Sequence, residues 1–123
     1  YFDRLRITAN CAAVTGACLM VKKARFQEVG GFDEALSVAF NDVDFCIRLL
    51  KAGYYNLCLS HLTLYHHESQ TRGPEDTVEK QLRFRGEIDL MKERWGNLLK
   101  NDPFYSPHLT RECEDFSICV DPT

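Results

Sequence analysis

Three short segments carry side chains of types that could do chemistry. They are the run at 41–44 (Asn-Asp-Val-Asp), the run at 66–69 (His-His-Glu-Ser) and the loop at 30–34 (Gly-Gly-Phe-Asp-Glu). Carboxylates can accept protons, and imidazoles and carboxylates can bind metal ions. Each segment also has a structural interpretation, because aspartate caps helices, loop histidines are often solvated, and glycine ends helices. Alone, none of the three specifies a function.

The composition bounds what the elements around these segments can be. The chain has 123 residues, 45% of them hydrophobic and 27% charged, with a net charge of −3. This is typical of a globular domain. The absence of a basic excess argues against nucleic-acid binding, and no apolar run reaches the roughly 18 residues of a membrane span. The first residues, Tyr-Phe-Asp-Arg, lack a methionine and a signal-peptide pattern, so we expect a piece of a longer protein.

The six cysteines show no Cys-x-x-Cys pair, which argues against a zinc site. Four of them lie in apolar stretches, where a thiol behaves as a small hydrophobic group. We therefore expect reduced, buried cysteines in a cytosolic protein, with a disulfide between Cys113 and Cys119 as the alternative. The four are Cys11, Cys18, Cys46 and Cys58.

The pattern before residue 66 predicts alternating strands and helices, which favours an α/β layer. A buried strand is expected at 11–22, interrupted at Thr15-Gly16, and a short helix at 23–29, ended by the two glycines. A second helix should open at Asn41-Asp42, with these residues as its N-caps, and end at Gly53. Its expected apolar face consists of Val43, Cys46, Ile47 and Leu50. Two further strands are expected at 54–60 and 62–65.

A long helix is expected at 77–99, where Asp76 and Glu79 resemble a capping box. Apolar residues recur along it at spacings of three and four, which predicts a stripe facing the core. The stripe consists of Phe84, Ile88, Met91, Trp95 and Leu98. Residues 101–123 hold three of the four prolines and are rich in acids, so they predict an extended, acidic C-terminal tail.

In their order and spacing, these segments resemble the family-2 glycosyltransferases. The matching runs are 13–17, 26–34, 41–54 and 65–69. The resemblance covers about residues 10–73 and is to the C-terminal, acceptor-side half of that family. The helix that follows, with 93–96 (Glu-Arg-Trp-Gly), and Asp102-Pro103 resemble a rhamnosyltransferase-like subgroup.

The resemblance implies an α/β fold of the GT-A type, of which this chain would be the C-terminal portion. Residues 1–100 would then be the C-terminal half of the glycosyltransferase domain, with core motifs at 11–73 and the long helix at 77–99. Residues 101–123 would be the tail. The nucleotide-binding half of the GT-A fold, with its metal-binding Asp-x-Asp, has no counterpart in this sequence.

The resemblance also implies roles for the acidic run. Asp42 matches the position of the catalytic base, with Asn41 where glutamate often stands. An ionised carboxylate there would accept the proton of an acceptor hydroxyl as that oxygen attacks the anomeric carbon. Asp44 is the secondary candidate, as a polar contact or a cap for Arg48.

Further site residues follow from the same resemblance. His66, with His67 as the alternative, matches a ligand of the Mg²⁺ or Mn²⁺ ion beside the donor diphosphate. Thr71 and Arg72 would lie over that diphosphate, because an arginine fork suits phosphate oxygens. The remaining expected substrate contacts are small or loop residues: Thr15, Gly16, Ala17, Gly31, Phe32 and Asp33.

The implied function is inverting transfer of a sugar from a nucleotide-diphospho-sugar donor to a hydroxyl of a glycan or lipid-linked glycan. Such a reaction belongs to envelope polysaccharide synthesis, in the cytoplasm or at the inner face of the membrane, and the isolated chain should be inactive. The alternative is a non-catalytic module that folds or dimerises without binding nucleotide. A metal hydrolase using His66, His67 and Glu68 is a weaker third hypothesis. A homodimer is expected through an unpaired apolar strand edge at 14–21.

Overall fold

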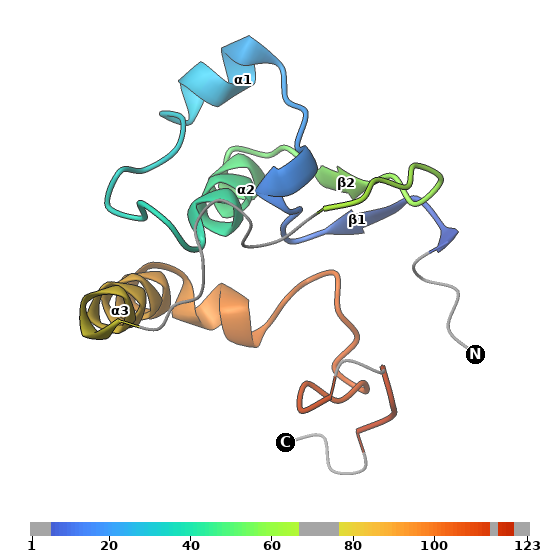
Figure 1. Cartoon of the computed structure of the whole chain (residues 1–123). Coiled ribbons are helices and arrows are strands. Elements are labelled where there is room, and N and C mark those ends of the chain that lie inside the picture. The colour runs from blue at the N-terminus through green and yellow to red at the C-terminus, as the bar shows by residue number, and fades with distance from the viewer. Residues whose placement is uncertain (1–5, 67–76, 114–115, 120–123) are drawn as a thin grey trace.

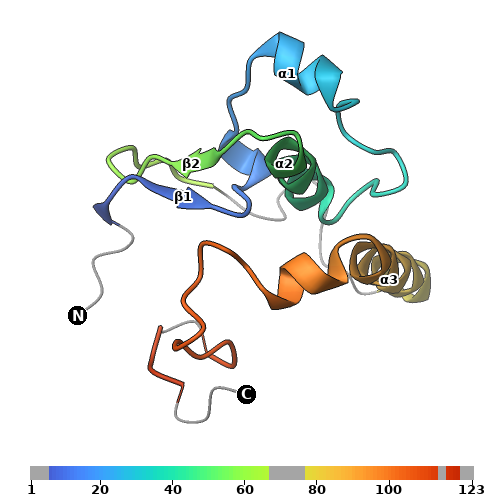
Figure 2. The same cartoon turned by 180° about the vertical axis from the view of Figure 1, so that it is seen from behind.

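The computed structural model describes residues 6–66, 77–113 and 116–119. The elements in chain order are β1 (Ala9–Cys11), the 3-10 helix η2 (Gly16–Cys18), α1 (Lys23–Glu28), α2 (Asn41–Lys51), β2 (Asn56–Cys58) and α3 (Val78–Lys100). Strands β1 and β2 form a two-stranded antiparallel sheet in which Asn10 pairs with Leu57. Helix α2 lies in the middle, with the sheet beside it and α1 and α3 on opposite sides (Figures 1 and 2). This arrangement is compatible with the predicted α/β class.

The predicted strands are mostly wrong. Of the run at 11–22 only Cys11 lies in a strand, and the run at 62–65 forms none. Instead the chain turns at η2, where the Thr15 hydroxyl accepts a hydrogen bond from the Ala17 N–H. The segment after this turn is not buried, since Met20 is 99% exposed. The strand predicted at 54–60 is shorter and covers only β2.

The first two helices match the prediction in extent and in the glycines that end them, but the N-cap of α2 differs. Gly30 follows α1 with φ 83°, and Gly53 follows α2 with φ 87°, the left-handed conformation in which glycine ends helices. The N-cap of α2 is Phe40, which itself has φ 64° and makes no side-chain cap bond. Asp42 therefore lies inside the first turn, where its Oδ1 accepts a hydrogen bond from the Val43 N–H.

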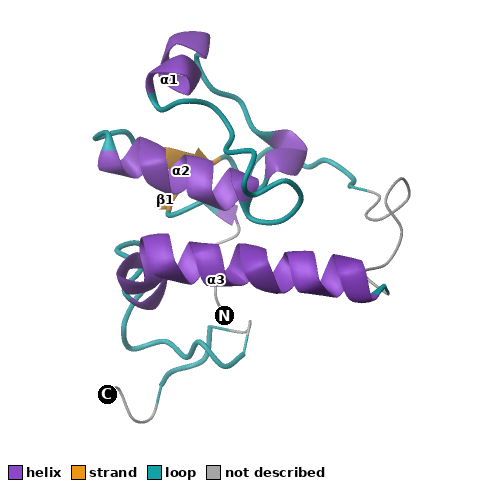
Figure 3. Cartoon of the chain, turned by 90° about the vertical axis from the view of Figure 1, so that its left-hand side faces the viewer, coloured by secondary structure: helices purple, strands orange, loops and turns teal. Residues whose placement is uncertain are grey.

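Helix α2 is buried on more than its predicted face. Cys46 and Ile47 are buried as predicted, and so are Asp44, Phe45 and Leu49. Neighbouring elements on several sides of α2 explain this, and Figure 3 shows α3 running alongside it. This broader burial places a charged residue, Asp44, inside the molecule. The central apolar cluster consists of Leu36, Ile47 and Met91, with Phe40, Val43, Leu90, Trp95 and Leu98 packed against it.

Helix α3 begins where the sequence predicts. Thr77 is its N-cap and accepts a hydrogen bond from the Lys80 N–H; Asp76 lies outside the described residues. The predicted stripe is confirmed at its C-terminal end, where Met91 is buried and Trp95 and Leu98 pack on the core. No helix among the described residues is long and apolar enough to cross a membrane.

Glu87 of α3 fixes the turn that leads into α2. Its carboxylate is almost fully buried and accepts hydrogen bonds from the N–H groups of Val38 and Ala39, at 3.0 and 3.1 Å. These amides directly precede Phe40, whose ring stacks on Phe84 of α3 at a centroid distance of 5.6 Å. A left-handed conformation is unfavourable for a bulky residue, and these contacts with α3 hold Phe40 in it.

The cysteines differ from the prediction in burial. Cys46 is buried, but Cys18, Cys58 and Cys113 are exposed. None of the six is in a disulfide, so the alternative Cys113–Cys119 disulfide does not form in this structure.

The segment after α3 turns back on itself. Leu109 and Ile118 form an antiparallel bridge, and the rings of Tyr105 and Phe116 lie 6.0 Å apart. Phe104 contacts Tyr55, next to β2, edge to face at 6.3 Å. The described part of the predicted tail is therefore looped and not simply extended.

Candidate functional site

Two segments that the sequence suggested separately meet in the structure. The Oδ2 of Asp42 accepts a hydrogen bond of 2.7 Å from the backbone N–H of Gly16, although the two residues are 26 positions apart. Gly16 fits closely here, because an added Cβ would lie 3.3 Å from the Asp42 side chain. The predicted base therefore lies directly against the turn formed by Thr15, Gly16 and Ala17.

A buried asparagine and a buried cysteine hold the segment that leads to this turn. The Nδ2 of Asn56 donates to the carbonyl oxygens of Ala12 and Cys46, both at 3.0 Å. The Cys46 thiol contacts the carbonyl oxygen of Val14 at 3.8 Å. Burial raises the pKa of this thiol. Because the thiolate is the reactive form, Cys46 serves packing and not nucleophilic chemistry.

The carboxylate of Asp42 can accept further hydrogen bonds. It is only partly buried, and the backbone N–H groups of Gly16 and Val43 each donate a hydrogen bond to one of its oxygens. Each carboxylate oxygen has two lone pairs, so one acceptor site per oxygen remains beyond these bonds. A proton from a substrate hydroxyl can be accepted there.

Asp44 has a different environment, although it is only two residues away. It is fully buried, and its Oδ2 accepts a hydrogen bond of 2.8 Å from the Nε of Arg48. Its Oδ1 accepts from the Nε1 of Trp95 at 2.8 Å and from Arg94 at 3.3 Å. These contacts agree with the predicted polar contact to Arg48, and they make Asp44 a structural carboxylate to which we assign no proton transfer.

The loop at 30–33 is fixed by its glycine and its aspartate. Gly31 is buried with φ 68°, and an added Cβ would lie 2.8 Å from the ring of Phe26. The Asp33 carboxylate accepts from the Ala35 N–H at 2.8 Å and pairs with Arg94 at 2.6 Å. These two contacts, the amide first, lower the pKa of Asp33. Between them, Phe32 remains 46% exposed.

The predicted metal and diphosphate contacts are largely beyond what the structure describes. His66 is exposed at the end of the described segment, whereas His67, Glu68, Thr71 and Arg72 lie outside it. Among the residues that are described, no three histidine, cysteine, aspartate or glutamate side chains group as a metal site. We therefore derive no step through a metal from the described residues.

Several residues that build the site were missed by the sequence analysis. Asn56 lies in an apolar run, and Glu87 lies on the face that carries Met91; a polar residue within an apolar pattern is the only signal that marks either. Arg94 entered only through the subgroup resemblance, and Trp95 was also predicted as part of the apolar stripe but not as a partner of Asp44. Their contacts with Asp44 depend on how α3 packs on α2.

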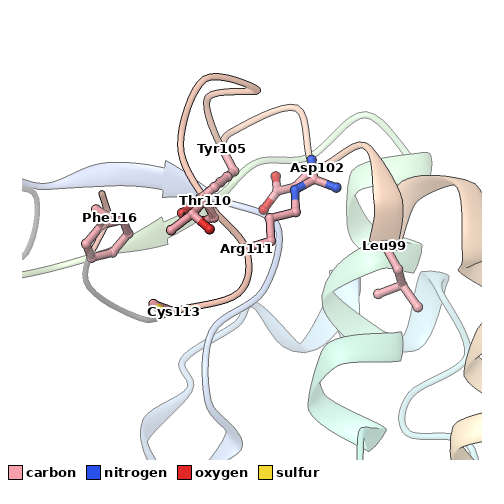
Figure 4. Close-up of a pocket in the computed structure, with 7 residues that line it drawn as sticks. All are labelled: Leu99, Asp102, Tyr105, Thr110, Arg111, Cys113 and Phe116. Atoms are coloured by element: carbon pink, nitrogen blue, oxygen red, sulfur yellow. The ribbon is translucent and has the colours of Figure 1, made fainter. Parts of the chain in front are cut away.

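A separate hollow of about 340 Å³ lies between the last turn of α3 and the residues that follow it (Figure 4). No residue predicted to belong to the site lines it. Its lining combines apolar and charged side chains: Leu99, Asp102, Tyr105, Thr110, Arg111, Cys113 and Phe116.

Comparison with known proteins gives relatives of this chain. It is 50% identical over 117 residues to an uncharacterized protein, y4gI, of Sinorhizobium fredii, a match that covers 94% of the chain and 13% of that protein. It is 33% identical over 116 residues to the O-antigen biosynthesis protein RfbC of Myxococcus xanthus, covering 93% of the chain and 9% of that protein. No protein-family model and no solved structure matches.

A third relative bears directly on the class of protein. Over 60 residues the chain is 37% identical to the N-acetylglucosaminyl-diphospho-decaprenol L-rhamnosyltransferase of Mycobacterium tuberculosis, covering 49% of the chain and 20% of that protein. The similarities support a relationship to glycosyltransferases. The chain spans a fifth or less of the length of each of these relatives. Membership of family 2 and the GT-A type stay predictions.

Proposed function

We propose that this chain forms the acceptor-side part of an inverting glycosyltransferase of family 2 and the GT-A type, in which Asp42 is the catalytic base. The observation that carries the proposal is the contact between the Asp42 carboxylate and the turn at 15–17. The names of two relatives, an O-antigen biosynthesis protein and a rhamnosyltransferase, support the class of reaction.

In the proposed reaction a hydroxyl oxygen of the acceptor forms a bond to the anomeric carbon of the donor sugar. The bond from that carbon to the diphosphate oxygen breaks on the opposite face, so the configuration inverts. The hydroxyl proton passes to Asp42 and then to solvent, and a nucleoside diphosphate leaves. The small residues at 15–17 leave space for the sugar beside the base. The acceptor is a glycan or lipid-linked glycan, and the reaction takes place in the cytoplasm, at the inner face of the membrane.

The predicted ion remains part of this proposal. His66, or His67, would be one ligand of Mg²⁺ or Mn²⁺, which would offset the charge that develops on the leaving diphosphate.

The test uses the longest natural polypeptide that contains this sequence. It is incubated with UDP- and dTDP-sugars and lipid-linked glycan acceptors, with Mg²⁺ or Mn²⁺ and with chelator. Mass spectrometry detects the transfer, and NMR of the product reports the anomeric configuration. Metal-dependent transfer with inversion supports the proposal, and transfer with retention contradicts it.

The 123-residue chain itself is expected not to bind a nucleotide-sugar with micromolar affinity. The resemblance places the nucleoside pocket and the metal-binding Asp-x-Asp in a half of the fold that has no counterpart in this sequence. Isothermal calorimetry with UDP- and dTDP-sugars and Mn²⁺ measures this. A clear isotherm with a micromolar dissociation constant would place the nucleotide site within this chain.

We also propose that the chain associates with a second copy. Residues 14–21, which were predicted to form the unpaired edge, are not a strand. The sheet that does form has only two strands, and a two-stranded sheet is only marginally stable in water. Leu57, Leu62 and Leu64 are 54–69% exposed near it. Light scattering at about 100 µM with a reductant, which prevents disulfides between exposed cysteines, should give a dimer mass. A monomer mass at that concentration would contradict the proposal.

A further inference from the structure

Two arginines and two aspartates, Arg48, Arg94, Asp33 and Asp44, form an ion-pair network beside the loop at 30–33. Arg48 of α2 donates to the carbonyl oxygen of Gly31 at 2.6 Å, to that of Val29, and to the Oδ2 of Asp44 at 2.8 Å. All three side-chain nitrogens of Arg48 therefore donate hydrogen bonds within the protein. Arg48 holds the start of the loop against α2.

Arg94 of α3 links the two aspartates of this network. One of its terminal nitrogens lies 2.6 Å from the Oδ2 of Asp33 and 3.3 Å from the Oδ1 of Asp44. The charges of the two arginines and two aspartates balance. Because Asp44 is fully buried, its charge requires these partners. The loop is therefore held through its backbone by α2 and through Asp33 by α3.

Phe32 lies between these two anchors. Its ring packs edge to face on Phe26 and Phe45, at centroid distances of 5.4 and 5.2 Å, while 46% of the residue stays exposed. An aromatic ring held in this way presents a rigid apolar surface at little conformational cost on binding. The C–H face of a pyranose ring is a ligand of matching chemistry.

We propose that Arg94 is a positioning residue, which fixes the loop at 30–33 and thereby presents Phe32 to a sugar ring of the acceptor. The assignment to an acceptor rests on the proposed function. The fixing of the loop by Arg94 does not, so it can be tested without activity.

The structural test compares Arg94→Ala and Arg94→Lys with Arg85→Ala, which removes an exposed arginine from the same helix. In Arg94→Ala we expect amide exchange at Ala35 and Leu36 to become at least about tenfold faster, because both amides donate to Asp33. Amides at the end of α2 should keep their rates. Equal acceleration everywhere, or none, would overturn the proposal.

The pKa of Asp33, measured by NMR, gives a second readout. In Arg94→Ala it should rise towards its ordinary value but stay below it, because the Ala35 N–H still donates. Lysine restores the charge but not the planar guanidinium group. Arg94→Lys should therefore recover most of the lowering of the Asp33 pKa and part of the protection of the loop amides from exchange. If Arg94→Ala does not fold, Asp33→Asn breaks the same pair from its half-exposed end. An unchanged exchange rate in that variant would overturn the proposal equally.

The kinetic test uses the longest natural polypeptide and the same variants. Arg94→Ala should raise the KM for the acceptor by about tenfold with little change in kcat, because an interaction that binds the acceptor equally in the ground state and the transition state is lost. Arg94→Lys should raise the KM by less. A loss confined to kcat would contradict the role in presenting Phe32. If the Asp42 base assignment fails while loop exchange responds to Arg94, the proposed function fails and the positioning role stands.

Discussion

Replacing Asp42 with asparagine is expected to lower the rate of sugar transfer by about 10²–10⁴, the usual contribution of a positioned general base. The amide cannot take up the hydroxyl proton, whereas its oxygen can still accept the hydrogen bond from Gly16. Donor binding should therefore be spared. The measurement is kcat for the longest natural polypeptide containing this sequence, with donor affinity from calorimetry.

Asp89→Asn is a suitable control for this variant, since Asp89 is an exposed aspartate on α3. It should leave kcat unchanged. Turnover of Asp42→Asn close to that of the unaltered protein would exclude Asp42 as the base. The contact with Gly16 would then be purely structural.

Replacing Asp44 with alanine should lower the free energy of unfolding by about 3–5 kcal/mol, the cost of removing one partner from a buried ion pair. Arg48 and Arg94 would each lose a carboxylate oxygen, and the Trp95 N–H would lose its acceptor. Urea unfolding of the 123-residue chain followed by circular dichroism measures the change. A loss of this size is a large fraction of the stability of a small domain.

The control is Asp89→Ala, for which a change within about 0.5 kcal/mol is expected. Asp44→Asn should fall between the two, because the amide oxygen still accepts from Trp95 while the charge is lost. If Asp44→Ala unfolded at the same urea concentration as Asp89→Ala, the network around Asp44 would not contribute to stability.

The helices could be predicted from the sequence because their signals are local. Glycines with positive φ follow α1 and α2, and Thr77 caps α3 through a residue three positions away. The strands could not be predicted equally well. Cys11 of β1 pairs with Asn56 of β2, 45 residues later, and an apolar run alone does not say whether such a partner exists.

The candidate site, too, could be predicted only in part from the sequence. The resemblance identified Asp42 and the turn at 15–17 as parts of one site, and the structure places them in contact. Their catalytic roles stay predictions. The residues that support the site could not be foreseen, because Asn56, Glu87 and Arg94 act on backbone or side chains that only the tertiary packing brings within reach.

The ion-pair network of Asp33, Asp44, Arg48 and Arg94 also constrains how this sequence can diverge. Loss of a single member leaves a charge near the buried Asp44 without its counterpart. We therefore expect substitutions at these positions to be tolerated chiefly in compensated pairs, which would tie the loop at 30–33 to both helices. The surface of α3 away from Arg94 and Glu87 is free of this restraint and can drift independently.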